Sequence, residues 1–179
     1  INSHQYKPKG FLEADIFNMD PSIWNSIVEV NLSGTYYTCR EFGKKMKDNN
    51  FGVIVNFAST YAVVSSNPSL YSNNSMGNPI AYSASKGGVV QLTKSFANTW
   101  ARDNIQVNAV LPGYIDTTLT RQARVDIPEL QKRVEERTPA GRWGDPDDLG
   151  GIAVFLSSDA SNYVTGTAIP VDGGYSING

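Results

Sequence analysis

Residues 52–59, GVIVNFAS, form a short apolar run rich in β-branched side chains. A run of this length without polar alternation is typical of a strand buried on both faces of a parallel sheet. A second run of the same kind, IQVNAVL, occupies residues 105–111 and is ended by Pro112-Gly113. Between the two, apolar residues recur at helical spacing from Asn78-Pro79 to about Arg102. The sequence therefore predicts two parallel strands joined by a long helix.

The alternation of helix and strand extends to both sides of this unit. Asp20-Pro21 is a strong helix start, with the aspartate as cap and the proline in the first helical position, and it predicts a helix to about Lys47. The other expected elements are helical pieces at 117–137 broken near Pro128, a helix at 145–158, a strand at 167–171, and loops at 1–10 and 60–78. No repeat or linker divides the chain, so we expect an α/β fold with a parallel sheet in a single domain, residues 1–179.

The composition excludes several classes of function. The chain has 15 basic and 17 acidic residues and a net charge of −2, which argues against nucleic acid or an anionic membrane as a partner. No apolar run reaches the roughly 18 residues that a membrane helix needs. Cys39 is the only cysteine and cannot form an internal disulfide, so a reducing cytoplasm is the expected location. Cys39 itself is expected to be a small buried apolar group. His4 is the only histidine, which argues against a metal site or a histidine-based triad.

Four features with chemical potential stand in a fixed order along the chain. They are Asn31 in the first helix, Ser59 at the end of the first strand, Tyr82 with Lys86 in the second helix, and Pro112-Gly113 after the second strand. Tyr82 and Lys86 are four residues apart and share a helix face. A free tyrosine has a pKa of about 10, which a nearby ammonium and the helix amino end would lower.

This arrangement suggests acid–base chemistry on a substrate oxygen. Tyr82 could exchange a proton with that oxygen, Ser59 could hold it, and Asn31 could position a water that links Lys86 to solvent. Tyr-x-x-x-Lys alone is weak evidence, because an aromatic residue and a solvated lysine often share a helix face by chance. The joint order of all four features, each in its expected structural context, is what makes the pattern specific.

With these residues in place, the chain closely resembles the short-chain dehydrogenase/reductase family from about residue 10 to its end. The matching motifs are VNLSGTYY, GVIVNFAS, YSASKGGV, IQVNAVLPGYIDT, PAGRWGDPDDLGG and FLSSDASNYVTGTAIPVDGGY. The resemblance implies the carboxy-terminal half of a doubly wound, Rossmann-like parallel sheet. It also implies an oxidoreductase that uses NAD or NADP to interconvert a small alcohol and a carbonyl compound.

The resemblance assigns roles residue by residue. The catalytic set is Asn31, Ser59, Tyr82 and Lys86. The cofactor would be bound by Tyr82, Lys86, Pro112, Gly113, Ile115 and Thr117, the last four lining its nicotinamide and pyrophosphate end. Family members pair through two long helices into dimers or tetramers, and the corresponding helices here carry apolar residues on more than one face, so a homo-oligomer is expected.

The chain departs from the family in two respects. The glycine-rich G-x-x-x-G-x-G turn is absent, so the chain is expected to be truncated, poorly stable alone and a weak binder of NAD(P). Ser59 and Tyr82 are 23 residues apart, and the polar loop between them, with Arg121, Arg124, Arg142 and Trp143, suggests a polar, hydroxylated substrate. The expanded spacing and the PAGRWG motif resemble family members that act on sugars or sugar acids; the alternative is a surface loop with no substrate role.

Two other functions remain open from the sequence. The chain could be a non-catalytic remnant that oligomerises or partners with a full-length relative, as the missing glycine-rich part suggests. It could also be an isomerase or lyase that uses a bound cofactor. Neither the substrate, nor the direction of reaction, nor the choice between NAD and NADP follows from these residues.

Overall fold

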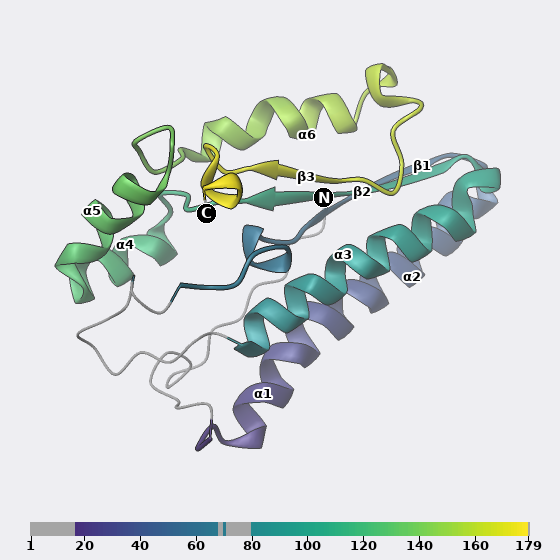
Figure 1. The fold of residues 1–179 in the computed structure, drawn as a ribbon. Coiled ribbons are helices and arrows are strands. Elements are labelled where there is room, and N and C mark those ends of the chain that lie inside the picture. Colours follow the sequence, from purple (N-terminus) through teal and green to yellow (C-terminus); the bar gives the residue numbers. More distant parts are fainter. Residues whose placement is uncertain (1–16, 68–69, 71–79, 179) are drawn as a thin grey trace.

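The computed structural model describes residues 17–67, 70 and 80–178. Figure 1 shows a small parallel sheet with helices on both of its faces. The helices are α1 (Pro21–Val28), α2 (Gly34–Asp48), α3 (Ile80–Trp100), α4 (Thr118–Asp126), α5 (Pro128–Arg137) and α6 (Gly150–Leu156). The strands are β1 (Gly52–Phe57), β2 (Ile105–Pro112) and β3 (Ala168–Val171).

The three strands form one parallel sheet in the order β1-β2-β3. β1 pairs with β2 from Gly52↔Ile105 to Phe57↔Val110, and β3 pairs with the other edge of β2. This confirms the predicted α/β class with a partial, doubly wound parallel sheet. Within the described residues β1 has a neighbour on one side alone, so its other edge is open to pairing.

Alternating strand residues pack against helices on opposite faces of the sheet. On one face, Ile54 and Val107 pack with the buried Cys39 of α2 and Ala97 of α3. On the other face, Val55 and Val110 pack with Leu156 of α6. Both faces of the sheet are therefore covered, as the unbroken apolar runs in β1 and β2 predict (Figure 1).

The first predicted helix is present but is not uniform. The side chain of Asp20 accepts a hydrogen bond from the backbone N–H of Ser22 at 2.8 Å, and Pro21 takes the first helical position, as expected. Between α1 and α2 the helix widens into one π-helical turn, Glu29–Ser33, which contains Asn31. Apolar periodicity did not predict this turn.

Most other element boundaries fall close to the predicted ones. α4 ends and α5 begins around Pro128, as expected. β1 ends at Phe57, two residues before Ser59, so the prediction that Ser59 ends the strand is wrong. The helix expected at 145–158 begins as a 3₁₀ turn, Pro146–Leu149. The predicted loop at 1–10, most of the loop at 60–78 and the start of the second helix at Asn78-Pro79 lie outside the described residues.

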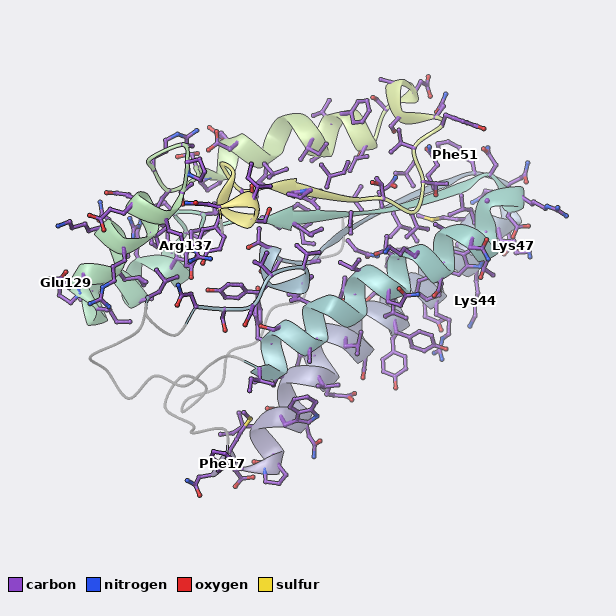
Figure 2. The ribbon with its side chains drawn as sticks, viewed as in Figure 1. Phe17, Lys44, Lys47, Phe51, Glu129 and Arg137 are labelled. Atoms are coloured by element: carbon purple, nitrogen blue, oxygen red, sulfur yellow. The ribbon has the colours of Figure 1, made fainter. Side chains whose placement is uncertain are left out.

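All three strands run toward the same end of the molecule, where α4 and α5 lie (Figure 1). Phe51, which precedes β1, marks the opposite end in Figure 2. None of the helices among the described residues combines the length and apolarity needed to cross a bilayer. Ligands of open α/β sheets bind beyond the carboxyl ends of the strands, so the α4–α5 end is where a site is expected.

Candidate active site

A pocket of about 280 Å³ lies at the carboxyl ends of β1 and β2. Its lining includes all of the predicted site residues except Asn31, and these are Ser59, Tyr82, Lys86, Pro112, Gly113, Ile115 and Thr117. They come from three separate segments of the chain, namely the turn after β1, the start of α3, and the last residue of β2 with the loop that follows it. The fold thus brings the predicted catalytic and cofactor-binding residues to one place.

Ser59 begins the turn that leaves the sheet after β1. It has an extended backbone, with a φ of −169°, and its Oγ accepts a hydrogen bond from the N–H of Tyr61 at 3.1 Å. This contact uses the oxygen of the hydroxyl as an acceptor and leaves its hydrogen available. Ser59 can therefore donate to an oxygen atom of a ligand while its own position stays fixed.

Tyr82 and Lys86 lie in the first two turns of α3, on the same side of the helix. The Lys86 Nζ lies 5.8 Å from the centre of the Tyr82 ring and donates a hydrogen bond to the backbone oxygen of Phe57 at 2.9 Å. Lys86 is only 2% exposed. The ammonium group is thus held between the end of β1 and the phenol of Tyr82, as the four-residue spacing predicts.

Asn31 does not line the pocket. It is fully buried in the π-helical turn, where its Nδ2 donates to the Oγ of Ser85 at 3.2 Å. The Thr35 hydroxyl donates to its backbone oxygen at 2.7 Å. Ser85 lies between Tyr82 and Lys86 on α3 and was not predicted from the sequence. Its place three residues after Tyr82, inside the YSASK motif, is the signal that could have identified it.

The loop after β2 needs glycine at position 113 because it passes close to the end of β3. A Cβ atom on Gly113 would lie 2.7 Å from the Cβ of Asp172, and the N–H of Gly113 donates to the oxygen of Val171 at 3.1 Å. Farther along, Thr117 caps α4 in a reciprocal arrangement with Thr120. These contacts fix the wall of the pocket opposite α3.

The arginines that suggested a polar substrate each have a carboxylate partner. Arg121 and Arg124 both donate to Asp116, and the hydrogen bond from Arg121 is the main reason that the pKa of Asp116 lies below its ordinary value. Arg142 binds Asp148 through two hydrogen bonds, of 2.7 and 3.0 Å. The guanidinium groups thus anchor the segments around α4 and the loop before α6.

An aromatic cluster that was not predicted as a unit from the sequence connects this region to the turn after β1. The hydroxyl groups of Tyr61 and Tyr114 lie 2.5 Å apart, and Tyr61 also packs against the group that contains Tyr82. The Tyr114 ring meets those of Trp143 and Tyr175 edge to face. Figure 2 shows Arg137 on α5 beside the C-terminal turn, where its guanidinium lies 5.0 Å from the centre of the Tyr175 ring.

Comparison with known proteins identifies the family. The family described as enoyl-(acyl carrier protein) reductase matches residues 1–176. The chain belongs to the short-chain dehydrogenase/reductase family. This confirms the resemblance that the motifs indicated.

Similar members of the family include proteins named for sugar-type substrates. Galactitol 2-dehydrogenase (L-tagatose-forming) from Cereibacter sphaeroides is 37% identical and matches 91% of this chain. 2-Dehydro-3-deoxy-D-gluconate 5-dehydrogenase from Bacillus subtilis (strain 168) is 44% identical and matches 85%. A crystal structure of gluconate 5-dehydrogenase from Burkholderia cenocepacia J2315, in complex with NADP and tartrate, superposes on 92% of this chain with a TM-score of 0.81 and 35% identity.

The chain is shorter than these relatives. It spans 61% of the length of the galactitol dehydrogenase, 56% of the Bacillus subtilis protein and 60% of the Burkholderia cenocepacia structure. The family match over residues 1–176 spans the whole of the pocket described above.

Proposed function

We propose that the complete protein that carries this chain is an NAD(P)-dependent oxidoreductase that interconverts an alcohol and a carbonyl group. The observation that carries this proposal is the pocket at the strand ends, which unites Ser59, Tyr82 and Lys86. We further propose that residues 1–179 form a single catalytic region of that protein. The family assignment supports both statements.

The residues of the pocket suit the nicotinamide end of the cofactor. Pro112 and Ile115 offer apolar surface, and Thr117 offers a hydroxyl. The pocket of about 280 Å³ would take the nicotinamide end of the dinucleotide. The bound cofactor would supply the site that accepts or donates hydride. The Burkholderia cenocepacia relative was crystallised with NADP, which supports a nicotinamide cofactor here.

In this proposal the protein handles the proton that accompanies the hydride. Ser59 donates a hydrogen bond to the substrate oxygen, and Tyr82 gives a proton to that oxygen or takes one from it. The ammonium group of Lys86 lies beside the Tyr82 ring and stabilises the phenolate form. The family resemblance includes Asn31 in the catalytic set. Its side chain donates a hydrogen bond to Ser85, the residue that directly precedes Lys86.

We propose a sugar-like substrate, either a polyol or a sugar acid. The names of the galactitol and 2-dehydro-3-deoxy-D-gluconate dehydrogenases support this class. The family description instead names an acyl thioester reductase. The test compares kcat/KM of the complete protein for galactitol and gluconate, each with NAD⁺ and with NADP⁺, and for an enoyl thioester with NADH and with NADPH. A sugar-type substrate should be preferred at least about tenfold, and a preference for the thioester would contradict the proposal.

We propose that a second copy of the chain pairs along α2 and α3. These helices border a shallow groove of about 420 Å³ whose lining includes Leu32, Tyr36, Tyr37 and Leu92. Tyr37 is 47% exposed and Phe42, farther along α2, is 58% exposed. Exposed apolar surface of this kind is typical of an interface. Sedimentation of the complete protein should show a dimer or tetramer, and Tyr37→Glu should weaken it; a monomer at micromolar concentration would refute this.

A further inference from the structure

A buried polar contact joins the π-helical turn to the helix that carries Tyr82 and Lys86. The Asn31 Nδ2 donates to the Oγ of Ser85 at 3.2 Å, and the same Oγ donates to the backbone oxygen of Tyr82 at 2.7 Å. Asn31 is 0% exposed and Ser85 is 1% exposed. Water therefore does not compete for either contact. A wrong pairing would leave a buried donor or acceptor without a partner, which would reduce the stability of the fold.

The chemistry of a hydroxyl group allows only one arrangement of these contacts. A serine hydroxyl has one hydrogen and can donate once. The backbone oxygen of Tyr82 can only accept, so the hydroxyl hydrogen of Ser85 is used in the bond to it. Ser85 must then accept from residue 31, and only the NH₂ side of the Asn31 amide can donate. The amide orientation is thereby fixed, with Nδ2 toward Ser85 and Oδ1 turned away from it.

The surroundings hold the backbone of Asn31 as firmly as its side chain. Its backbone oxygen accepts from the Thr35 hydroxyl at 2.7 Å. The adjacent Leu32 packs so closely on α3 that a Cβ atom on Gly88 would lie 2.8 Å from its Cδ1. π-Helical turns occur frequently at functional sites, where they place a particular side chain. In this turn the side chain so placed is Asn31.

We propose that Ser85 is a positioning residue that sets the orientation of the Asn31 amide relative to Tyr82 and Lys86. It touches neither substrate nor cofactor and acts through Asn31. Ser85 lies on the same helical turn as Tyr82 and Lys86. It therefore couples the orientation of the Asn31 amide to the position of these two residues. This inference rests on the proposed function and on the catalytic role that the family resemblance assigns to Asn31.

The first test uses steady-state kinetics of the complete protein. Ser85→Ala should lower kcat about tenfold, the scale of one lost hydrogen bond, and should change KM and the cofactor Kd less than threefold. Ser85→Thr keeps a hydroxyl that can bond the preceding turn, and it should restore most of kcat. Thr99→Ala is the matched control, since the hydroxyl of Thr99 bonds the oxygen of Ser95 on the exposed side of the same helix; its kcat should equal that of the unmodified protein.

A double-mutant comparison separates positioning from simple stability. In an Asn31→Ala background, adding Ser85→Ala should lower kcat less than about twofold, because Ser85 acts through Asn31. Independent, multiplying effects would overturn the proposal. A normal kcat in Ser85→Ala with a lower Tm would also overturn it, because Ser85 would then be only structural.

Amide exchange measured by NMR distinguishes failure of this inference from failure of the proposed function. The side-chain NH₂ of Asn31, assigned by its absence in Asn31→Ala, should exchange at least about ten times faster in Ser85→Ala than in the unmodified protein. A complete protein without nicotinamide-dependent turnover would refute the proposed function, and the exchange rate would still decide on the Ser85 contact. Equal exchange rates with and without the Ser85 hydroxyl would overturn the inference.

Discussion

The Nζ of Lys86 donates a hydrogen bond to the backbone oxygen of Phe57 at 2.9 Å. This contact links the first turns of α3 to the last residue of β1. Ser59 lies two residues beyond Phe57, and Tyr82 lies one helical turn before Lys86. The Lys86 side chain therefore ties the helix that carries Tyr82 to the end of the strand that leads to Ser59, the two side chains that we propose to hold the substrate oxygen.

Replacing this ammonium group should affect both stability and catalysis. Lys86→Met keeps the length of the side chain and removes its charge, so the Phe57 oxygen loses a charge-assisted donor. We expect the free energy of unfolding to fall by about 1–3 kcal/mol, as measured by urea denaturation. We also expect turnover to fall at least about a hundredfold. Unchanged turnover in Lys86→Met would show that the lysine has no part in the reaction.

Two glycines, one in the loop after β2 and one in α3, should respond to alanine in opposite ways. In Gly113→Ala the new methyl group would lie 2.7 Å from the Asp172 Cβ and 2.8 Å from its Cα, so the loop must move. We expect a loss of about 1–3 kcal/mol in stability together with weaker cofactor binding.

Gly87→Ala is the matched control within α3. The nearest atom to its new methyl group is the oxygen of Ala62, at 3.8 Å, which is an ordinary contact distance. Because alanine favours the helix, we expect a gain of about 0.5–1 kcal/mol. Thermal unfolding of both variants checks the pair, and equal effects at the two positions would contradict the close packing seen at Gly113.

The ion pair between Arg142 and Asp148 should make stability depend on pH in a defined range. The hydrogen bond from Arg142 lowers the pKa of Asp148 to about 2, from 3.8. A carboxylate with a lowered pKa stabilises the folded state above its unfolded pKa, and this contribution is lost as the pH falls through the folded pKa. Above about pH 4, the unmodified protein should therefore unfold at a higher urea concentration than the Asp148→Asn variant.

The difference between these two proteins should then shrink as the pH approaches 2. Added salt should reduce it at every pH, because the pair is partly exposed. A difference that stays constant from neutral pH down to pH 2 would mean that the contact with Arg142 does not control this carboxylate.

Local pattern was enough to predict most of the fold. The apolar runs predicted β1 and β2, and Asp20-Pro21 predicted the start of α1. Each of these signals lies within a few residues of the element that it specifies. The π-helical turn at Glu29–Ser33 had no such signal. Residues of this turn contact Gly88 and Ser85, which are more than fifty residues away in the sequence. The periodicity of apolar residues within one helix cannot predict such contacts.

The same distinction applies to the candidate site. Ser59, Tyr82 and Lys86 were predicted because the motif order and the expected elements placed them at one end of the sheet. The pairing of Tyr61 with Tyr114 was not predicted, because these residues are 53 positions apart and meet only when the turns after β1 and β2 pack together. The ion pairs of Arg121, Arg124 and Arg142 were likewise visible only in three dimensions.

The most direct test is the effect of Tyr82→Phe on the complete protein, measured as turnover of a sugar-type substrate and as cofactor affinity by calorimetry. Removal of one hydroxyl should lower kcat by about 10²–10⁴-fold, and the Kd for NAD or NADP should change less than threefold. If Tyr82→Phe keeps more than a tenth of the turnover, the phenol is not the proton donor and acceptor. The account of this pocket as an oxidoreductase site would then be wrong.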